Sequence, residues 1–118
     1  MQEEKIILGI DPGTSIMGFG LVKKKGANFE MIMMDVLILN KLNDPYLKLQ
    51  KIFQKTLAII DHYNPDEVAL EAPFFGKNVQ SMLKLGRAQG VAMAAALQRE
   101  VPVTEYAPLK IKKAIPGR

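Results

Sequence analysis

The spacing of hydrophobic residues changes along the chain, and its first two hydrophobic segments predict a pair of adjacent strands. An unbroken apolar run, Ile6–Ile10, is typical of a strand buried on both faces. Asp11 follows at the end of that run, and a Pro-Gly pair after it indicates an immediate turn. A second strand over Met17–Val22 is expected to return beside the first, with its apolar side chains on one face and Gly18 and Gly20 on the other. Because glycine weakens a strand, two at alternate positions indicate that another group approaches the backbone closely.

The rest of the pattern predicts three more strands, two helices and a final helical turn. Proline and polar capping residues mark the boundaries, as at Asp44, which is expected to cap the first helix. The expected elements in chain order are a strand Phe29–Leu39, a helix from Pro45 to about His62, a strand Glu67–Glu71, a helix from Lys77 to about Arg99, a strand Pro102–Tyr106 and a helical turn Pro108–Ile115.

In each helix the spacing singles out one face. Apolar residues of the first helix recur every three or four positions and are expected to form its buried stripe: Tyr46, Leu49, Phe53, Leu57 and Ile60. Its lysines are expected on a solvated side: Lys48, Lys51 and Lys55. One face of the second helix has a centre of small residues: Val79, Leu83, Gly86, Gly90, Ala94 and Leu97. That face either packs on the sheet or forms a dimer seam, and the pattern leaves both open.

These elements predict an α/β fold in one domain that spans residues 1–118. A strand–helix–strand connection is right-handed and makes its two strands parallel, so Glu67–Glu71 is expected beside Ile6–Ile10. The expected architecture is a mixed five-stranded sheet in order 3-2-1-4-5, with strand 2 antiparallel and helices on its faces. This order brings Asp11 and Glu71 to adjacent strand ends, where ligands of open α/β sheets bind.

Two neighbouring carboxylates at strand ends predict a cation site. Without a cation between them, Asp11 and Glu71 would repel each other, and one would take up a proton. Oxygen ligands favour Mg²⁺, with Mn²⁺ as a substitute. Paired hard cations about 4 Å apart activate a water and stabilise the leaving 3′ oxygen in phosphodiester hydrolysis. A simpler alternative is that Asp11 only caps the turn of a hairpin.

Composition narrows these possibilities only slightly. The chain has 118 residues, no cysteine and one histidine, His62, which excludes disulfides, zinc–thiolate sites and multi-histidine metal sites within one chain. No apolar run is long enough to span a membrane, and the start lacks the features of a signal peptide, so the expected location is the cytoplasm. A net charge of +4 permits a polyanionic partner. Several basic residues flank the expected site: Lys77, Lys84, Lys110 and Lys112.

Four motifs in a fixed order carry a family resemblance. They are Gly9-Ile-Asp-Pro-Gly-Thr followed by Gly18-Phe-Gly20, Leu70-Glu71 followed by an aromatic and Lys77-Asn78, Leu83-Lys-Leu-Gly with Gly90, and Glu105-Tyr-Ala107. From about Lys5 to Lys113 the chain resembles the RuvC family, bacterial Holliday junction resolvases of the ribonuclease-H-like fold. The resemblance implies a homodimer that binds four-way junction DNA and nicks two opposing strands with Mg²⁺ in recombination and repair. It also implies assembly with a branch-migration motor, RuvA and RuvB.

The resemblance also assigns roles by position. Asp11 and Glu71 match the first two metal-binding carboxylates and are expected to be catalytic. Phe74 matches an aromatic residue that contacts bases near the crossover, and Lys112 matches a catalytic-face lysine. The other expected DNA contacts are Lys77, Asn78, Lys84, Arg87 and Lys110.

After Lys113 the chain departs from the family pattern. RuvC proteins continue with further helices, the last of which carries two more aspartates within one turn, whereas here only Ala-Ile-Pro-Gly-Arg follows. As written, the chain is therefore expected to be an inactive or fragmentary form that lacks the family's C-terminal helices and does not cleave junctions. The missing segment is also expected to have covered the sheet, which predicts an exposed apolar surface.

Two other functions fit part of the pattern. One is a non-catalytic module for junction binding or dimerisation. The other is a phosphate-binding fragment of a sugar kinase or actin-like ATPase, which opens with a similar Gly-Ile-Asp-x-Gly-Thr hairpin. The chain is short for such a two-lobed ATPase, and the motifs from Glu71 to Tyr106 have no reason to recur there.

Overall fold

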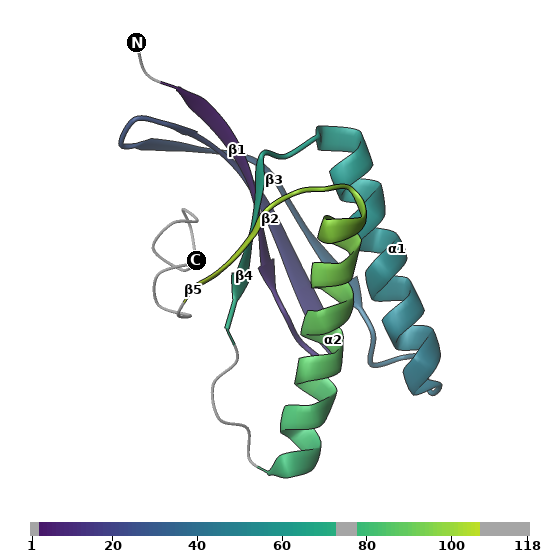
Figure 1. Ribbon diagram of the computed structural model, residues 1–118. Helices are drawn as coiled ribbons and strands as arrows, with labels where there is room; N and C mark the ends of the chain where they lie inside the picture. The colour runs from purple at the N-terminus through teal and green to yellow at the C-terminus, as the bar shows by residue number, and fades with distance from the viewer. Residues whose placement is uncertain (1–2, 73–77, 107–118) are drawn as a thin grey trace.

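The structure, a computed structural model, describes residues 3–72 and 78–106, which form one sheet with two helices against it (Figure 1). The elements in chain order are β1 Glu4–Asp11, β2 Ile16–Lys25, β3 Asn28–Ile38, α1 Pro45–Tyr63, β4 Glu67–Glu71, α2 Val79–Gln98 and β5 Val103–Tyr106. The five expected strands and both long helices are confirmed. Phe74, Lys77, Lys110, Lys112 and the helical turn expected over 108–115 lie outside the described residues.

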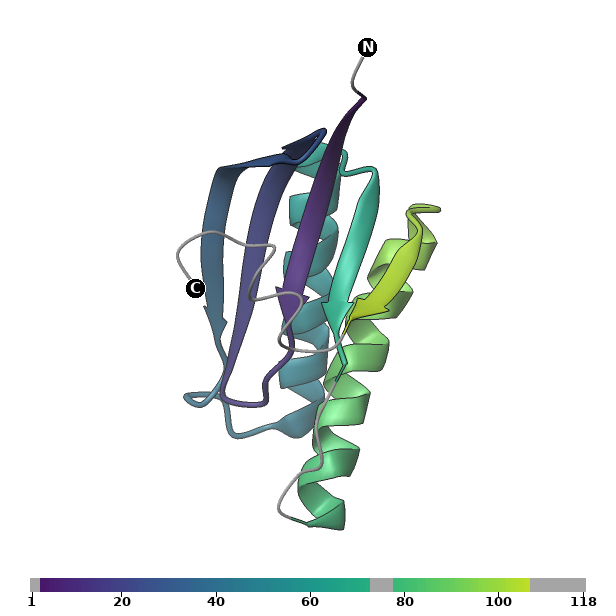
Figure 2. The ribbon, with the colours of Figure 1, turned by 90° about the vertical axis from the view of Figure 1, so that its left-hand side faces the viewer.

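The five strands lie in the order β3-β2-β1-β4-β5, which confirms the predicted order (Figure 2). β1 is the central strand and pairs antiparallel with β2 on one side and parallel with β4 on the other. β5 extends the parallel half beside β4. The turn between β2 and β3 places Gly26 at φ 61°, a backbone conformation that glycine adopts without strain.

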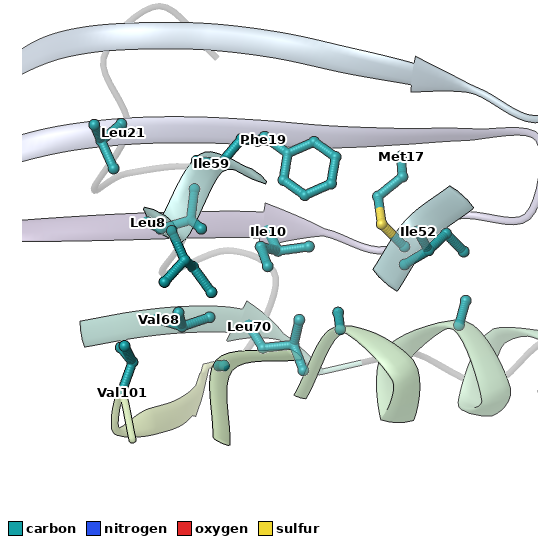
Figure 3. Packing of buried hydrophobic residues seen from close by; sticks show 14 of the residues in the cluster. Leu8, Ile10, Met17, Phe19, Leu21, Ile52, Ile59, Val68, Leu70 and Val101 are labelled. Atoms are coloured by element: carbon teal, nitrogen blue, oxygen red, sulfur yellow. The ribbon is translucent and has the colours of Figure 1, made fainter. Parts of the chain in front are cut away.

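Both helices cover the same face of the sheet, as Figures 1 and 2 show from two directions. The core lies between the helices and that face (Figure 3), and its largest strand residues are Leu8, Ile10, Met17, Phe19, Leu21, Val68 and Leu70. On β2 Met17, Phe19 and Leu21 point into the core and the two glycines lie on the opposite face, as predicted. On β1 the burial expected on both faces is complete on the helix side, at Leu8 and Ile10, while Ile7 on the opposite face is half-buried.

A side chain caps the first turn of each helix. The Asp44 Oδ1 accepts from the amide of Tyr46 at 2.9 Å, which confirms the predicted cap of α1. The Asn78 Oδ1 accepts from the amide of Ser81 at 2.9 Å at the start of α2. Asn78 therefore has a structural role that the sequence pattern did not indicate.

α1 turns a partly different face to the core from the one predicted. Its buried residues are Ile52, Thr56, Ile59 and Ile60. Of the predicted stripe, Ile60 is buried and Leu49 packs against the core, whereas Tyr46 is 77% exposed and Phe53 and Leu57 lie only at the border of the buried face. The prediction is therefore right at two positions and wrong at Tyr46. Thr56 tolerates burial because its hydroxyl donates to the carbonyl oxygen of Ile52 at 2.7 Å.

The small-residue face of α2 does not pack on the sheet. The helix buries another side: Ala88, Gln89, Ala92, Ala95 and Ala96. On the small-residue face, Leu83 is 50% exposed and Leu97 62% exposed. A Cβ added at Gly86 or Gly90 would meet no atom within 4 Å. Of the two interpretations of this face, packing on the sheet is therefore excluded.

The sheet face opposite the helices, termed here the open face, exposes apolar side chains on β2 and β3. They are Ile16, Met34, Val36 and Ile38, each between 51% and 53% exposed. Ile38 is the cross-strand partner of Ile16, and Val36 and Met34 are the partners of Gly18 and Gly20, so all of them share this face. An exposed apolar surface on the sheet was expected, and it is present.

Candidate active site

Asp11 and Glu71 end two adjacent parallel strands side by side. The paired positions of β1 and β4 run up to Ile10 and Leu70, so the next residue on each strand is one of the two carboxylates. Ile10 and Leu70 point into the core, and therefore Asp11 and Glu71 point to the open face. Both residues are half-buried. The structure thus brings the two predicted carboxylates together, while their role as metal ligands stays a prediction.

The backbone beside Asp11 carries no side chains on the open face. Gly18 is the cross-strand partner of Asp11, and Gly20 is the partner of Gly9, two positions along the ladder and on the same face. Two adjacent strands therefore present bare backbone next to the carboxylate pair. This arrangement gives a bulky chain such as a nucleic-acid backbone room to approach the carboxylates.

The loop after Asp11 is held by close backbone contacts. A Cβ at Gly13 would lie 2.1 Å from the carbonyl oxygen of Ile16, so no other residue fits there without a backbone shift. The carbonyl oxygen of Ser15 accepts from the amides of Leu39 and Asn40 at 2.8 and 3.1 Å, which ties the loop to the end of β3. The direction in which the chain leaves Asp11 is therefore fixed by packing.

Of the basic residues predicted to contact DNA, Lys84 and Arg87 lie in the described part of the chain. Both line a cleft on the helix side of the sheet, together with Lys48 of α1 and the loop residues Gly13 and Thr14. They therefore lie around the edge of the sheet from the carboxylate pair. The sequence pattern had assigned Lys48 to plain solvated surface.

A second polar cluster on the open face was not predicted. Glu67, at the start of β4, accepts from the hydroxyl of Thr104 at 2.9 Å and from that of Tyr106 at 3.3 Å, and pairs with Lys5 at 3.2 Å. Burial is the largest single influence on Glu67 and raises its pKa, but the three partners together outweigh it and lower the pKa. Burial and the neighbouring Glu67 carboxylate raise the pKa of Tyr106.

This cluster is better explained by structure than by catalysis. Glu67 lies four residues before Glu71 on β4, while Tyr106 is the cross-strand partner of Glu71, so the cluster runs from the start of β4 to the carboxylate pair. Its polar atoms satisfy one another and join β1, β4 and β5. No spacing rule links Lys5, Glu67 and Thr104, and only the strand register brings them together.

Within the described residues, no group of three or more metal-binding side chains is present. Asp11 and Glu71 offer at most four carboxylate oxygens, and a six-coordinate Mg²⁺ needs further ligands from water or substrate phosphate. A pair of carboxylates with no histidine or cysteine suits a hard cation in its chemistry and fills only part of its coordination shell. In the same part of the chain, no helix has the length and hydropathy that a bilayer span requires.

Comparison with known proteins decides the family. A family model described as crossover junction endodeoxyribonuclease RuvC matches residues 7–118. This chain belongs to the RuvC family. The resemblance in its motifs is thereby confirmed, and so is the ribonuclease-H-like architecture expected from it.

Relatives and a solved structure of RuvC match almost the whole chain. It is 65% identical to the RuvC of Christiangramia forsetii over 99% of this chain and 61% of that protein. It is 66% identical to the RuvC of Bacteroides fragilis over 98% of this chain and 61% of that protein. The structure of T. thermophilus RuvC in complex with a Holliday junction substrate matches with a TM-score of 0.85 and 30% identity, over 97% of this chain and 70% of that one. The chain thus spans about three fifths of the length of these two curated relatives.

Proposed function

We propose that this protein is a structure-specific endonuclease of branched DNA that binds four-way junctions and holds the scissile phosphates at Asp11 and Glu71. The observation that supports this most directly is the pair of carboxylates at the ends of β1 and β4, beside bare backbone, in a chain of the RuvC family. The T. thermophilus relative, whose fold this chain shares, is in complex with a Holliday junction substrate. Such a role belongs to recombination and repair of chromosomal DNA, and the location proposed with it is the bacterial cytoplasm.

Asp11 and Glu71 are the proposed ligands of Mg²⁺, for which Mn²⁺ is a substitute. When bound, the cation supplies an activated water and charge neutralisation at the phosphate. The protein's own part is to hold two carboxylates at fixed strand ends, which keeps them close despite their mutual repulsion. The glycines of β1 and β2 keep the approach to them open.

The proposed DNA contacts surround this pair. Lys84 and Arg87 are exposed cations on the first half of α2 and suit phosphate contacts that weaken as salt rises. Phe74, Lys77, Lys110 and Lys112 are proposed from the family pattern alone, with Phe74 stacking on bases at the open centre of a junction and Lys112 on the catalytic face. Asn78 combines its cap with a proposed DNA contact through its remaining polar atoms.

A homodimer is proposed through the small-residue face of α2. That face exposes Leu83 and Leu97 with Gly86 and Gly90 between them, so a second helix has room to approach closely. Two copies related by a two-fold axis would present two carboxylate pairs, as nicking of two opposing strands requires. The branch-migration proteins RuvA and RuvB are proposed as partners on the family pattern.

A second candidate function is a junction-binding or dimerisation module without cleavage activity. The observation that favours it for these 118 residues is the absence of a third carboxylate near Asp11 and Glu71 within the described residues. With so few ligands, a second cation would be poorly positioned, and positioning is decisive for this chemistry. Losing one strong electrostatic contact in a transition state commonly costs about 10²–10³ in rate.

One experiment separates the two candidates. Purified protein is titrated with a synthetic four-way junction and with duplex of the same arm sequence, and nicking is followed in Mg²⁺ and then in Mn²⁺. We expect tighter binding to the junction and nicking at least about 10²-fold slower than by a chimera in which the Bacteroides fragilis relative supplies the remaining length. Asp11→Asn should abolish nicking by the chimera and leave junction binding in place.

Two results would contradict these proposals. Equal affinity for junction and duplex would remove junction recognition from both candidates. Symmetric nicks by the 118 residues alone, lost in Asp11→Asn, would show that two carboxylates suffice and would exclude the module without activity.

A further inference from the structure

A cleft of about 350 Å³ lies between α1 and α2 on the helix side of the sheet. Its apolar floor includes Leu49 and Ile52 of α1 and Ala88 of α2, and the loop residues Gly13 and Thr14 form one wall. Asp11 precedes Gly13 by two residues, so their Cα atoms are at most about 7 Å apart. The cleft and the carboxylate pair therefore lie on opposite faces of the sheet and share the loop between them.

Three cations line this cleft: Lys48, Lys84 and Arg87. None of them forms an ion pair within residues 3–72 and 78–106, whereas Lys5, Lys23, Lys25, Lys55 and Arg99 each contact a carboxylate there. The acid closest to Lys48 along the chain is Asp44, the N-cap of α1, and its Oδ1 accepts from the amides of Tyr46 and Leu47 at 2.9 and 3.4 Å. The charge of the cleft is thus available to an anionic ligand.

An aromatic ring stands beside these cations. Tyr46 lines the cleft and is 77% exposed, although its position in the hydrophobic period predicted burial. An exposed ring next to several cations matches the pattern by which proteins hold single-stranded nucleic acid, with phosphates on the cations and a base on the ring. A second copy of this chain is a poor occupant of the cleft, because it would bury Lys48, Lys84 and Arg87 against a chain that is itself net positive.

We propose that this cleft binds the backbone phosphates of a DNA strand that continues past the carboxylate pair, with an unpaired base stacked on Tyr46. The proposal rests on the proposed function for the strand's origin, since that function puts a DNA strand at Asp11. Lys48 and Tyr46 of α1 thereby join Lys84 and Arg87 of α2 in one site, and the DNA footprint extends around the edge of the sheet.

The test compares single substitutions in the full 118-residue chain. Affinities for a four-way junction and for a single-stranded oligonucleotide are measured by fluorescence anisotropy across a salt series. Lys48→Ala is expected to weaken both and to reduce the slope of log affinity against log salt by about 0.7–0.9, as loss of one phosphate contact does. Lys51→Ala, an equal charge change at an exposed position on the same helix outside the cleft, should leave the slope nearly unchanged.

The role of Tyr46 is tested with one disruptive and one conservative substitution. Tyr46→Ala is expected to weaken binding of the oligonucleotide by roughly 10-fold, whereas Tyr46→Phe should retain it, because stacking needs the ring and not the hydroxyl. An iodouracil-substituted strand should cross-link to the tyrosine in the wild type and not in Tyr46→Ala.

Three results would overturn the proposal. The first is that Lys48→Ala and Lys51→Ala change the affinity for the oligonucleotide by the same amount. The second is that Tyr46→Ala binds the oligonucleotide as tightly as wild type. The third is that Lys48→Ala alters dimerisation and leaves the affinity for DNA unchanged. The oligonucleotide arm keeps this test separate from the proposed function. If wild type prefers the junction no more than duplex, junction recognition fails, while the comparison of variants on the oligonucleotide still decides the cleft.

Discussion

At Gly13 the position of a single atom decides which residue the chain accepts. A Cβ there would lie 2.1 Å from the carbonyl oxygen of Ile16, and a backbone oxygen yields only if the loop moves. The loop also begins at Asp11 and forms one wall of the cleft between the helices. A substitution at Gly13 is therefore expected to alter the position of Asp11 as well as the stability of the fold.

Gly13→Ala is predicted to lower the free energy of unfolding by about 1–3 kcal/mol, because the loop must shift to admit the methyl group. Urea denaturation measures the change. Gly86→Ala is the matched control: its Cβ would meet nothing within 4 Å, and alanine in a helix interior is expected to add about 0.5–1 kcal/mol. Equal and small effects of the two substitutions would show that the Gly13 loop adapts freely.

Asp11→Asn is predicted to weaken the binding of Mn²⁺, because it removes one of the two negative charges at the site. Even in the wild type the affinity should be low, since two carboxylates fill only part of a six-oxygen shell. Isothermal titration calorimetry compares wild type, Asp11→Asn, Glu71→Gln and the exposed control Glu105→Gln. Affinity that is the same in all four proteins would remove both carboxylates from the site.

At the scale of elements, the Glu67 cluster ties three strands together. Lys5 belongs to β1, Glu67 to β4, and Thr104 and Tyr106 to β5, so one carboxylate joins the central strand to the edge of the sheet. Glu67 binds a proton less readily in the folded state than an ordinary glutamate, because its lowered pKa reflects partners that favour the charged form. Its stabilising contribution is fully present above the ordinary glutamate pKa of about 4.3 and is lost as the pH falls through the lower pKa of the folded state.

Glu67→Gln is therefore predicted to reduce stability by about 1–2 kcal/mol at pH 7 and to have a smaller effect at pH 3. Urea denaturation at both pH values measures the difference between wild type and variant. Asp35 and Asp61 also have lowered pKa values, through Lys55 and Arg99, but they are present in both proteins and their effects cancel in the comparison. A difference that stays constant from pH 7 to pH 3 would show that Glu67 stabilises through its shape alone.

The two helices show which features a hydrophobic period predicts and which it does not. The period predicts both helices, and Asp44 marks the start of α1 correctly. It only partly selects the buried face of α1, because apolar residues surround that helix and Thr56, a polar residue, takes a core position through a bond to its own backbone. In α2 the face that holds Leu83 is exposed, and a different face, rich in alanine, packs against the sheet.

For the whole molecule, topology rules predict the meeting of Asp11 and Glu71, but they do not predict the cleft. Strand order follows from the hairpins and the crossover, so the two carboxylates are placed before any side chain is packed. The cleft depends on how α1 lies against α2, which brings Lys48 into one cleft with Lys84 and Arg87. How α1 lies on the sheet decides that Lys55 instead contacts Asp35 of β3. The spacing of residues along a single sequence does not determine the angle at which two helices pack.

Two exposed apolar surfaces compete as the site of self-association, and a pair of substitutions distinguishes them. Leu83→Lys is predicted to weaken dimerisation at least about 10-fold, because it puts a charge into the α2 seam. Ile38→Lys makes the same change in character on the open face of the sheet, at a residue of similar exposure, and should leave dimerisation intact. Sedimentation equilibrium measures both. Loss of the dimer only in Ile38→Lys would move the seam from α2 to the sheet.

The central place of β1 also sets the order in which the molecule is able to fold. β1, β2 and β3 are consecutive and pair as antiparallel neighbours, so they form through short turns. The parallel contact with β4 joins positions 11 and 71, 60 apart in the chain, and must wait until α1 has closed the crossover. During synthesis, Asp11 therefore leaves the ribosome well before Glu71 exists. A nascent hairpin holds Asp11 without Glu71, so the carboxylate pair itself arises only with the long-range pairing of β1 and β4.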